Sequence, residues 1–595
     1  MRLLYIATAM TSVGLLAACG GSPSDSPAPA PAPSTPASIT LTGVVAEGAA
    51  LAGATVTAKC ATGTGTATSD SAGGYTLSIT NGALPCVLEA TSSDAATVLH
   101  SVATATTGST AATANITTLT ELLVAQLTGQ NPTAYMAGVS TASLSTTVTA
   151  ATVSTAQAGV VNTLTAAGID TTAIGNMVSG PLVAASTGTT GNAYDLVLDN
   201  LSAALTTSGT SFSQLVATVV TSSPAAPAPT AGTSTEASDL PAALLLKPQA
   251  SNCPALRSGS YRVVKVAPSV ATGANDAVTA VQTMNFDATT LTATFGADDT
   301  WVWTAGSHAC QFQAENADIV VSPSGVIVAR ALVGVDDDTT SDGGKFRMLI
   351  GVPAQSITVA ELAGTWNMIG WEAQTGSVRE ANSGISVVDG SGHTTGSKCF
   401  IDPMNTAEVS CSPETDLPTY SVHAEGGFTI THGDPSDVWS MRAFAYKAGN
   451  GELMMVWLNA QGELLLSTKY RTLSLPTEGS VSTSWNIAIT DAGVAGDVLS
   501  TTTNTIASIN GNTVTRHSQS GTSTVSVPQQ MAYNSPRNGF LRRTPETVTA
   551  SDGSSATVRE GYFLRLAGMG LTAYALPDNI AGTATNARFG LSIAQ

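Results

Sequence analysis

Two hydrophobic periodicities alternate along this chain. Between about residues 39 and 106, apolar side chains recur at every second position, and glycine-rich breaks separate the runs, as in Ala54, Val56, Ala58 and Cys60. Period two with turn signals is typical of half-buried β-strands. We therefore expect half-buried β-strands joined by turns over residues 38–110.

The period changes to that of a helix over residues 111–222. A capping-box pair, Thr118 and Glu121, precedes a leucine stripe that ends at Gly129. Further helices are predicted from Ala193 to about residue 207 and after Ser211. The Ala/Thr/Val-rich stretch 135–180 is also predicted to be helical from its length and few turn signals, although β-branched residues lower helix propensity.

The chain from residue 241 to residue 595 alternates polar and apolar residues in short runs, and all seven tryptophans lie there. This pattern predicts an all-β region of sandwich or barrel units. Three segments echo one another, Gly259-Ser260-Tyr261, Gly364-Thr365-Trp366 and Ser484-Trp485, which indicates two or three related units with a split near residue 360. The predicted fold class is mainly β and multidomain, with an N-terminal sandwich, a central α-helical segment and this C-terminal region.

The first 18 residues read as an export signal. A positive start at Arg2 precedes an apolar run too short to span a bilayer, and small residues precede Cys19. The segment resembles the bacterial lipoprotein signal. The resemblance implies palmitate-type acylation of Cys19 and anchoring to a membrane. Because Gly20 rather than an acidic residue follows, it implies the outer membrane, with the body periplasmic or surface-exposed. Pro/Ala/Ser-rich residues 19–37 and 223–240 are predicted to be extended linkers.

Residues 38–110 resemble a known sandwich family. The segments that carry the likeness are Gly43-Val44-Val45, Leu51-Ala52-Gly53-Ala54-Thr55-Val56 and Asp70-Ser71-Ala72-Gly73-Gly74-Tyr75-Thr76-Leu77. They resemble the carboxypeptidase regulatory-like domain, a transthyretin-like or prealbumin-like β-sandwich. The resemblance implies a fold and no peptidase activity, because in those enzymes a separate zinc domain carries the chemistry.

Charge and cysteine content narrow the function classes. The formal charge is −19, from 41 acidic and 22 basic residues, and excludes a nucleic-acid binder. Apart from Cys19, the chain has six cysteines, and in an oxidising compartment these are expected to form three disulfides. Many pairings are open, but the six fall two by two into separate segments, which favours Cys60–Cys86, Cys253–Cys310 and Cys399–Cys411. Without a Cys-x-x-Cys motif, we predict no metal site.

Candidate chemistry is sparse, and we predict no cofactor and no catalytic residues. The histidines are scattered, and Ser391 with His393 reads as a turn. Asp336, Asp337, Asp338 and Asp342 are clustered, but their spacing matches no calcium loop and favours a solvated loop. Trp301 and Trp303 flank Val302, which favours core packing; a stacking platform for sugar or a partner protein is the alternative.

The hypothesis for function is a non-enzymatic, lipid-anchored cell-envelope protein that binds or scaffolds through its β modules, with carbohydrate or envelope proteins as partners. One alternative is a carbohydrate-binding or hydrolytic surface protein that uses the Trp-rich region. Another is a carrier of apolar ligands, because Gly364 and Trp366 resemble the start of lipocalins, where the tryptophan plugs the barrel floor. A sugar binder requires exposed coplanar tryptophans, and a carrier requires an enclosed apolar cavity.

Overall fold

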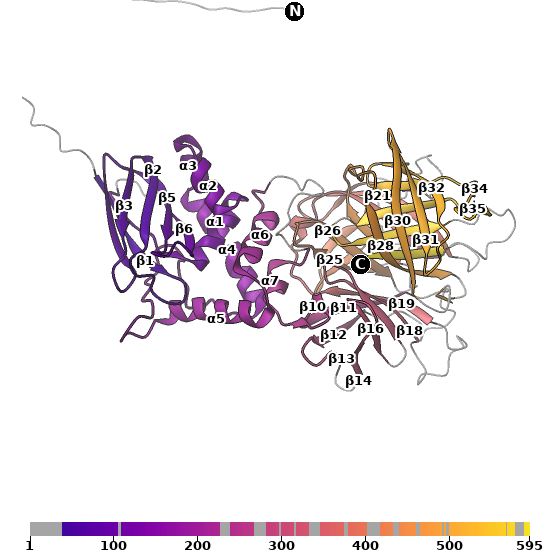
Figure 1. Cartoon of the computed structure of the whole chain (residues 1–595), viewed down its shortest axis with the longest axis horizontal. Helices are drawn as coiled ribbons and strands as arrows, with labels where there is room; N and C mark the ends of the chain where they lie inside the picture. The colour runs from indigo at the N-terminus through magenta and orange to yellow at the C-terminus, as the bar shows by residue number, and fades with distance from the viewer. Residues whose placement is uncertain are drawn as a thin grey trace, which may run out of the picture.

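The computed structural model describes residues 38–104, 109–226, 239–266, 281–296, 299–314, 317–332, 346–373, 379–400, 417–431, 440–459, 464–490, 493–494, 499–566, 568–576 and 588–595. The chain is mainly β and multidomain, as predicted, with a sandwich at one end, helices in the middle and barrel-like units at the other end (Figure 1). The predicted leader, Cys19, the 19–37 linker, most of the 223–240 linker, the 336–342 acidic cluster and Cys411 lie outside the described residues, as does the side chain of Cys399.

The N-terminal module is a sandwich of two sheets, ordered β4-β1-β7 with β8 beside β1, and β3-β2-β5-β6. Alternating side chains of both sheets form its core. Cys60 and Cys86 lie directly opposite each other on β2 and β5 and form a disulfide, which confirms this predicted pair. The strands are β1 (Ser38–Ala46), β2 (Thr55–Thr62), β3 (Thr64–Thr68), β4 (Gly74–Thr80), β5 (Ala83–Thr91), β6 (Val98–Ala103), β7 (Ala111–Thr113) and β8 (Ile116–Thr117).

The helices pack beside β2, β5 and β6 and continue the same apolar core. Gly129 and Gly209 end two of them in left-handed conformations, as predicted. Residues 168–180 are not helical, in contrast to the prediction, because Gly168 adopts a left-handed conformation that ends α4. The helices are α1 (Thr118–Thr128), α2 (Pro132–Gly138), α3 (Thr141–Thr147), α4 (Ala150–Ala167), α5 (Ala193–Ser208), α6 (Phe212–Ser222) and α7 (Ala242–Leu245).

The predicted capping box of α1 is wrong by one residue. Thr117, not Thr118, caps the helix, and Thr120 reciprocates the cap bond. The Glu121 side chain therefore takes no part in the cap, and it reaches the sandwich instead. Its Oε2 accepts hydrogen bonds from the backbone N of His100 at 2.6 Å and lies 2.8 Å from His100 Nδ1. Since His100 belongs to β6, this contact joins the sandwich to the helical segment.

His100 is fully buried and lies between two carboxylates, with Glu89 Oε2 3.3 Å from its Nε2. Burial disfavours the charged ring, but the hydrogen bonds and negative charges of Glu121 and Glu89 outweigh it and raise the pKa of His100 above its ordinary 6.5. The folded state therefore favours the protonated histidine.

We expect the stability of the N-terminal module to decrease as pH rises above about 6.5, the pKa of an unfolded histidine. The raised pKa contributes stability that is fully present below that value and is lost as pH rises through the folded-state pKa. Chemical denaturation of the full chain at a series of pH values measures the slope. His100→Gln should remove this pH dependence of the free energy of unfolding, and the control His517→Gln, at an exposed histidine, should keep it. An unchanged slope in His100→Gln would contradict the role given to His100.

The first barrel-like unit, unit 1, is a nine-stranded antiparallel sheet ordered β14-β13-β12-β11-β19-β18-β17-β16-β15. Trp303 alone separates β14 from β15, so the two edges meet and the sheet closes. A disulfide between Cys253 and Cys310 ties its entrance strand β10 to the start of β16, as predicted. The strands are β9 (Gln249–Ala250), β10 (Cys253–Arg257), β11 (Gly259–Val266), β12 (Val281–Asp287), β13 (Thr292–Phe295), β14 (Asp299–Val302), β15 (Thr304–Ala305), β16 (Gln311–Ala314), β17 (Ala317–Val321), β18 (Ile327–Leu332) and β19 (Phe346–Pro353).

Unit 2 is an eight-stranded antiparallel sheet in which β20 pairs with β27. Its outer strands β22 and β23 meet through the bridge between His393 and Thr419, so this sheet also closes. The elements are the 3-10 helix η1 (Val359–Leu362) and strands β20 (Gly364–Ala373), β21 (Arg379–Val388), β22 (Thr394–Phe400), β23 (Thr419–Val422), β24 (Phe428–Thr431), β25 (Ser440–Lys447), β26 (Leu453–Asn459) and β27 (Leu464–Lys469).

Unit 3 closes through the pairing of its first long strand, β28, with its last, β38. The hairpin of β34 and β35 lies between β33 and β36 in the chain. The strands are β28 (Val481–Thr490), β29 (Gly493–Val494), β30 (Ser500–Asn510), β31 (Thr513–Ser520), β32 (Val527–Tyr533), β33 (Phe540–Arg543), β34 (Glu546–Thr549), β35 (Ser555–Val558), β36 (Gly561–Leu566), β37 (Leu571–Leu576) and β38 (Arg588–Ala594).

The three segments that echo one another in the sequence lie in the first strands of the three units. Gly259 and Gly364 each begin a strand with positive φ, at 153° and 125°, which favours glycine. Two residues on, Tyr261 Oη donates to the carbonyl of Arg257 at 2.7 Å, and Trp366 Nε1 donates to the carbonyl of Leu362 at 2.8 Å. Trp485 differs, since it packs on the outer face of unit 3.

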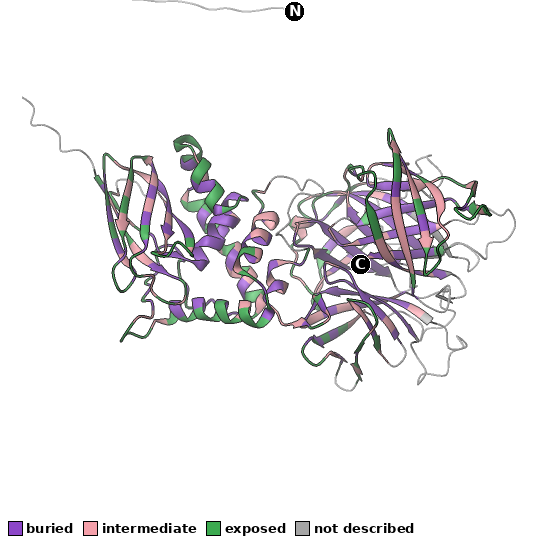
Figure 2. Cartoon of the chain, viewed as in Figure 1, coloured by how far each residue is buried: buried purple, intermediate pink, exposed green. Residues whose placement is uncertain are grey.

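The outer faces of the three units meet in one apolar core, the shared core. In each unit, alternate residues of several strands face inward while their neighbours face this core, so these strands are buried on both faces. Buried positions, purple in Figure 2, run along them. Members of the shared core include Val264, Met348 and Ile350 of unit 1, Trp371, Tyr446 and Val456 of unit 2, and Ile487, Leu564 and Phe589 of unit 3.

A chain of two hydrogen bonds crosses the shared core. The hydroxyl of Tyr446 in unit 2 donates to the carbonyl of Ser324 in unit 1. The Ser324 hydroxyl in turn donates to the carbonyl of Met569 in unit 3 at 2.9 Å. All of these atoms are buried, so their mutual pairing replaces water that cannot reach them.

We expect Tyr446→Phe to lower the free energy of unfolding by about 1–3 kcal/mol, because the Ser324 carbonyl loses a partner inside the shared core. Equilibrium denaturation in guanidinium measures the change. Tyr470→Phe is the control, since Tyr470 is 38% exposed and its change should stay within about 0.5 kcal/mol. If the two variants lowered the free energy of unfolding equally, the hydrogen bond of Tyr446 across the shared core would contribute nothing to stability.

Candidate functional site

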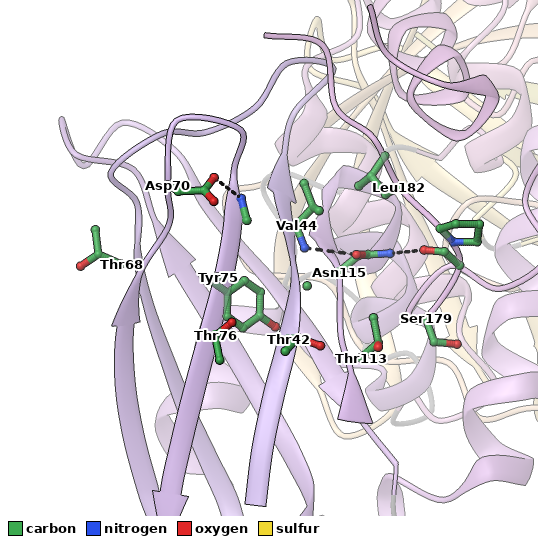
Figure 3. A pocket seen from close by; sticks show the side chains of 14 residues that line it. Thr42, Val44, Thr68, Asp70, Tyr75, Thr76, Thr113, Asn115, Ser179 and Leu182 are labelled. Atoms are coloured by element: carbon green, nitrogen blue, oxygen red, sulfur yellow. Dashed lines mark hydrogen bonds between the residues drawn. The ribbon is translucent and has the colours of Figure 1, made fainter. Parts of the chain in front are cut away.

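The N-terminal module has an open groove of about 600 Å³ beside strands β1 and β4. The groove runs between the face of these strands and the segment 179–182, which lies between α4 and α5 in the chain (Figure 3). Hydroxyl-bearing side chains dominate its lining, and Asp70 is the one charged residue among them. The lining hydroxyls belong to Thr42, Thr68, Tyr75, Thr76, Thr113 and Ser179.

Hydrogen bonds hold the groove in shape. The Asn115 amide accepts from the backbone N of Val44 and donates to the carbonyl of Gly180 at 2.7 Å, so it ties the two walls together (Figure 3). Asp70 Oδ1 accepts from the backbone N of Gly74 at 2.8 Å and closes a turn. The Tyr75 hydroxyl donates to the carbonyl of Ala114, and burial raises the pKa of Tyr75, so it stays neutral.

The chemistry of this groove is that of neutral hydrogen bonding. Its charged residue, Asp70, is engaged with backbone N–H groups of its own turn. A nucleophile needs a base within hydrogen-bond reach, and the lining residues include no histidine, cysteine or lysine. The groove can therefore hold a polar ligand but supplies no acid–base pair to act on it.

The two tryptophans singled out by the sequence lie in unit 1. Trp303 is 4% exposed, and its ring centroid lies 4.8 Å from that of Phe286 and 5.7 Å from that of Phe312. Trp301 is half-buried against Phe295 at 5.1 Å. The exposed neighbour between them is Val302, at 63%. Trp303 is therefore a core residue, and the two rings do not form an open stacking platform.

We expect Trp303→Ala to lower the free energy of unfolding by about 3–5 kcal/mol, the usual cost of truncating a large buried aromatic side chain. Val302→Ala, one position away and exposed, should change it by less than about 0.5 kcal/mol. Denaturant titration of the full chain compares the two. A Trp303→Ala protein as stable as the parent would reopen the stacking interpretation.

Trp366 occupies the interior of unit 2, next to η1. The Lys469 ammonium lies 4.2 Å from the centre of its ring and donates to the carbonyl of Leu362, which also accepts from Trp366 Nε1. Burial lowers the pKa of Lys469 to about 8. Large side chains such as Phe428, Met455 and Trp457 pack into the same interior, so this lumen is a packed apolar core.

Ser391 and His393 lie in the exposed turn between β21 and β22. Ser391 Oγ is 2.8 Å from His393 Nδ1 and donates to Asp389 Oδ1 at 2.8 Å. Asp389 also accepts from the backbone N of His393. In a catalytic triad, the histidine uses one ring nitrogen for the serine and the other for the acid; here Nδ1 faces both. The predicted turn is confirmed.

Unit 3 contains a polar interior that sequence reasoning missed. Arg516 on β31 and Arg543 on β33 project into the lumen, and both guanidiniums lie near the Phe563 ring, at 5.8 Å and 5.5 Å from its centre. The available signal was the alternation in Val514, Arg516 and Ser518, which places the arginine on the buried face of its strand.

No group of three or more histidine, cysteine, aspartate and glutamate residues suited to a metal occurs within the described ranges. In the same part of the chain, none of the helices has the length and apolarity needed to cross a membrane.

Comparison with known proteins assigns no family. No family model and no curated protein matches the chain. Among solved structures, a DUF3598 protein from Nostoc punctiforme has 10% identity and a TM-score of 0.17, covering 40% of this chain and 100% of that one. Transferrin binding protein B is similar at 6% identity for Haemophilus parasuis (TM-score 0.19, 53% and 66% covered) and 8% for Neisseria meningitidis (0.18, 58% and 78%). These scores are too low to transfer a fold or a function.

Proposed function

We propose that this chain is a non-enzymatic, lipid-anchored protein of the bacterial cell envelope that binds or scaffolds a partner through its β modules. Cys19 carries the acyl chains, and residues 20–37 are an extended spacer between the lipid surface and the sandwich. Its partners are the membrane, through the anchor, and a carbohydrate or another envelope protein. The N-terminal module is proposed to be a carboxypeptidase regulatory-like sandwich.

The observation that carries the binding role is the fusion of three closed sheets into one body. Because their outer faces share a core, the strands of the three units are held in fixed positions relative to one another. Binding residues are commonly placed on loops that a rigid scaffold positions. The asymmetry of the chain is compatible with tethering, since the sandwich follows the proposed anchor in the sequence and the barrel-like units lie at the far end of the described structure from the sandwich (Figure 1).

The alternative functions find less support. Among the described tryptophans, Trp303, Trp366, Trp371, Trp457 and Trp485 are all buried, which leaves Trp301 as the partly exposed ring and offers no coplanar pair for a sugar. The interior of unit 2, where a lipocalin-like carrier would hold its ligand, is packed with apolar side chains.

We expect Cys19→Ala to release the protein from the membrane fraction and to abolish labelling with palmitate, because acylation of this sulfur supplies the anchor and two or more chains give stable attachment. Cell fractionation with an immunoblot and metabolic labelling measure both. Ser24→Ala, in the same spacer, should remain in the membrane fraction and keep its label. A Cys19→Ala protein that still sediments with membranes, or a parent that takes up no palmitate, would refute the anchor.

A further inference from the structure

The interior of unit 3 is built differently from those of units 1 and 2. Apolar side chains make up most of the interiors of the first two units, although Lys265 of unit 1 and Lys469 of unit 2 also lie on inward faces; in unit 3 the strands place two arginines inward. On β31, Arg516 shares the inward face with buried Val514 and Ser518 and lies opposite Gln529 of β32. On β33, Arg543 shares the inward face with Leu541.

The register brings the two arginines to one ring. Leu541 lies opposite Phe563 of β36, and Arg543 lies opposite Gly561, against which the side chains of Phe563 and Leu576 pack. The guanidiniums of Arg516 and Arg543 are 5.8 Å and 5.5 Å from the centre of the Phe563 ring. A cation over an aromatic face gains a favourable electrostatic contact, but this contact does not neutralise two positive charges.

Neither arginine has a carboxylate partner among the described residues. Arg516 donates through Nε and Nη2 to Gln529 Oε1, at 3.3 Å and 3.0 Å. Arg543 donates through Nε to the backbone carbonyl of Arg559 at 2.7 Å. Within the described part of the chain, the remaining guanidinium N–H groups of both therefore have no acidic partner.

Three other arginines of the C-terminal region contact carboxylates, and the side chain of one of them, Arg542, is 43% exposed. Arg542, the neighbour of Arg543 on the outer face, lies 2.8 Å from Glu560, and Arg330 lies 3.2 Å from Asp318. Arg471 contacts Glu452. Buried charges are costly unless they are paired. Acids pair with these three arginines and backbone carbonyls accept from buried Arg257, whereas no carboxylate of the described residues contacts the two arginines that share the lumen.

The electrostatics of the lumen follow from this arrangement. Burial, and then the charge of Arg543, lower the pKa of Arg516 to about 10. Burial also lowers the pKa of Arg543 to about 10. Both groups stay cationic at neutral pH, so the lumen carries two positive charges in a chain whose net charge is −19. Both side chains remain partly accessible to solvent.

We propose that the lumen of unit 3 is an anion-binding site, in which Arg516 and Arg543 hold the carboxylate or phosphate group of a small molecule. Planar guanidiniums match both groups through paired N–H donors. Asn504, on the strand next to Arg516, has a buried side-chain oxygen without a hydrogen-bond partner, which suits a ligand that also carries a hydroxyl or amine. The inference rests on the proposed function in one respect, because it assigns a ligand to one of the β modules. It does not depend on lipid anchoring.

Isothermal titration calorimetry of the full chain in detergent, at low ionic strength, tests the site. The probes are inorganic phosphate and succinate, which separate the two anion classes, with glycerol as the uncharged control. We expect saturable binding of at least one anion with Kd near or below about 1 mM, and none of glycerol. Arg516→Gln and Arg543→Gln should each weaken it by about tenfold or more. The control Arg559→Gln removes an exposed charge of the same unit but keeps the carbonyl that Arg543 uses, and should bind like the parent.

Thermal denaturation with and without the binding anion separates loss of the site from loss of folding. The anion should raise the melting temperature of the parent and of Arg559→Gln but not of Arg516→Gln, which should be as stable as the parent without anion because it removes an uncompensated charge. Two outcomes would overturn the proposal: no saturable binding of phosphate or succinate, or binding that survives in the Arg516→Gln, Arg543→Gln double variant. Either leaves the result of the Cys19→Ala fractionation unaffected.

Discussion

The C-terminal half of this protein depends on the burial of the outer faces of three closed sheets against one another. A closed antiparallel sheet normally buries one face and exposes the other to water. Here the strands nearest the junction are apolar on both faces, as in Leu453–Asn459, where alternate residues enter the interior of unit 2 and the shared core. A unit on its own would expose a large apolar patch, so the three are stable as one body.

This dependence also determines where polar groups can lie. Inside the shared core they pair with one another across unit boundaries, as Tyr446 does with Ser324, or at the boundary of units 2 and 3, where buried Asn367 bonds to Asn538 and Arg537. The lumen of unit 3 is the contrasting case, because two cations enter it and no carboxylate of the described residues contacts them. The hydrogen bonds across unit boundaries help to hold the three units together. The two arginines in the lumen of unit 3 are the groups that a ligand can contact.

The two halves of the chain are joined by a compact polar contact. Arg257, at the entrance of unit 1, is 3% exposed and donates to the carbonyls of Ser208, Leu245 and Lys247, which end α5 and α7. Cationic groups near helix C-termini also interact favourably with the helix dipole. The helical segment thus connects the sandwich with the barrel-like units.

Local features were predictable from the sequence because short-range rules govern them. Period-two alternation identified the sandwich strands, glycines marked the ends of α1 and α5, and cysteine positions indicated the pairs Cys60–Cys86 and Cys253–Cys310. Only the tertiary structure decided which residues meet across long separations. It closed the sheet of unit 3 through the pairing of its first and last long strands, and it buried Trp303 between Phe286 and Phe312. It also placed Glu121 against His100 instead of in the predicted cap, and brought Arg516 and Arg543 to one ring. Alternation shows that a side chain faces inward, but what it meets there depends on strands far away in the chain.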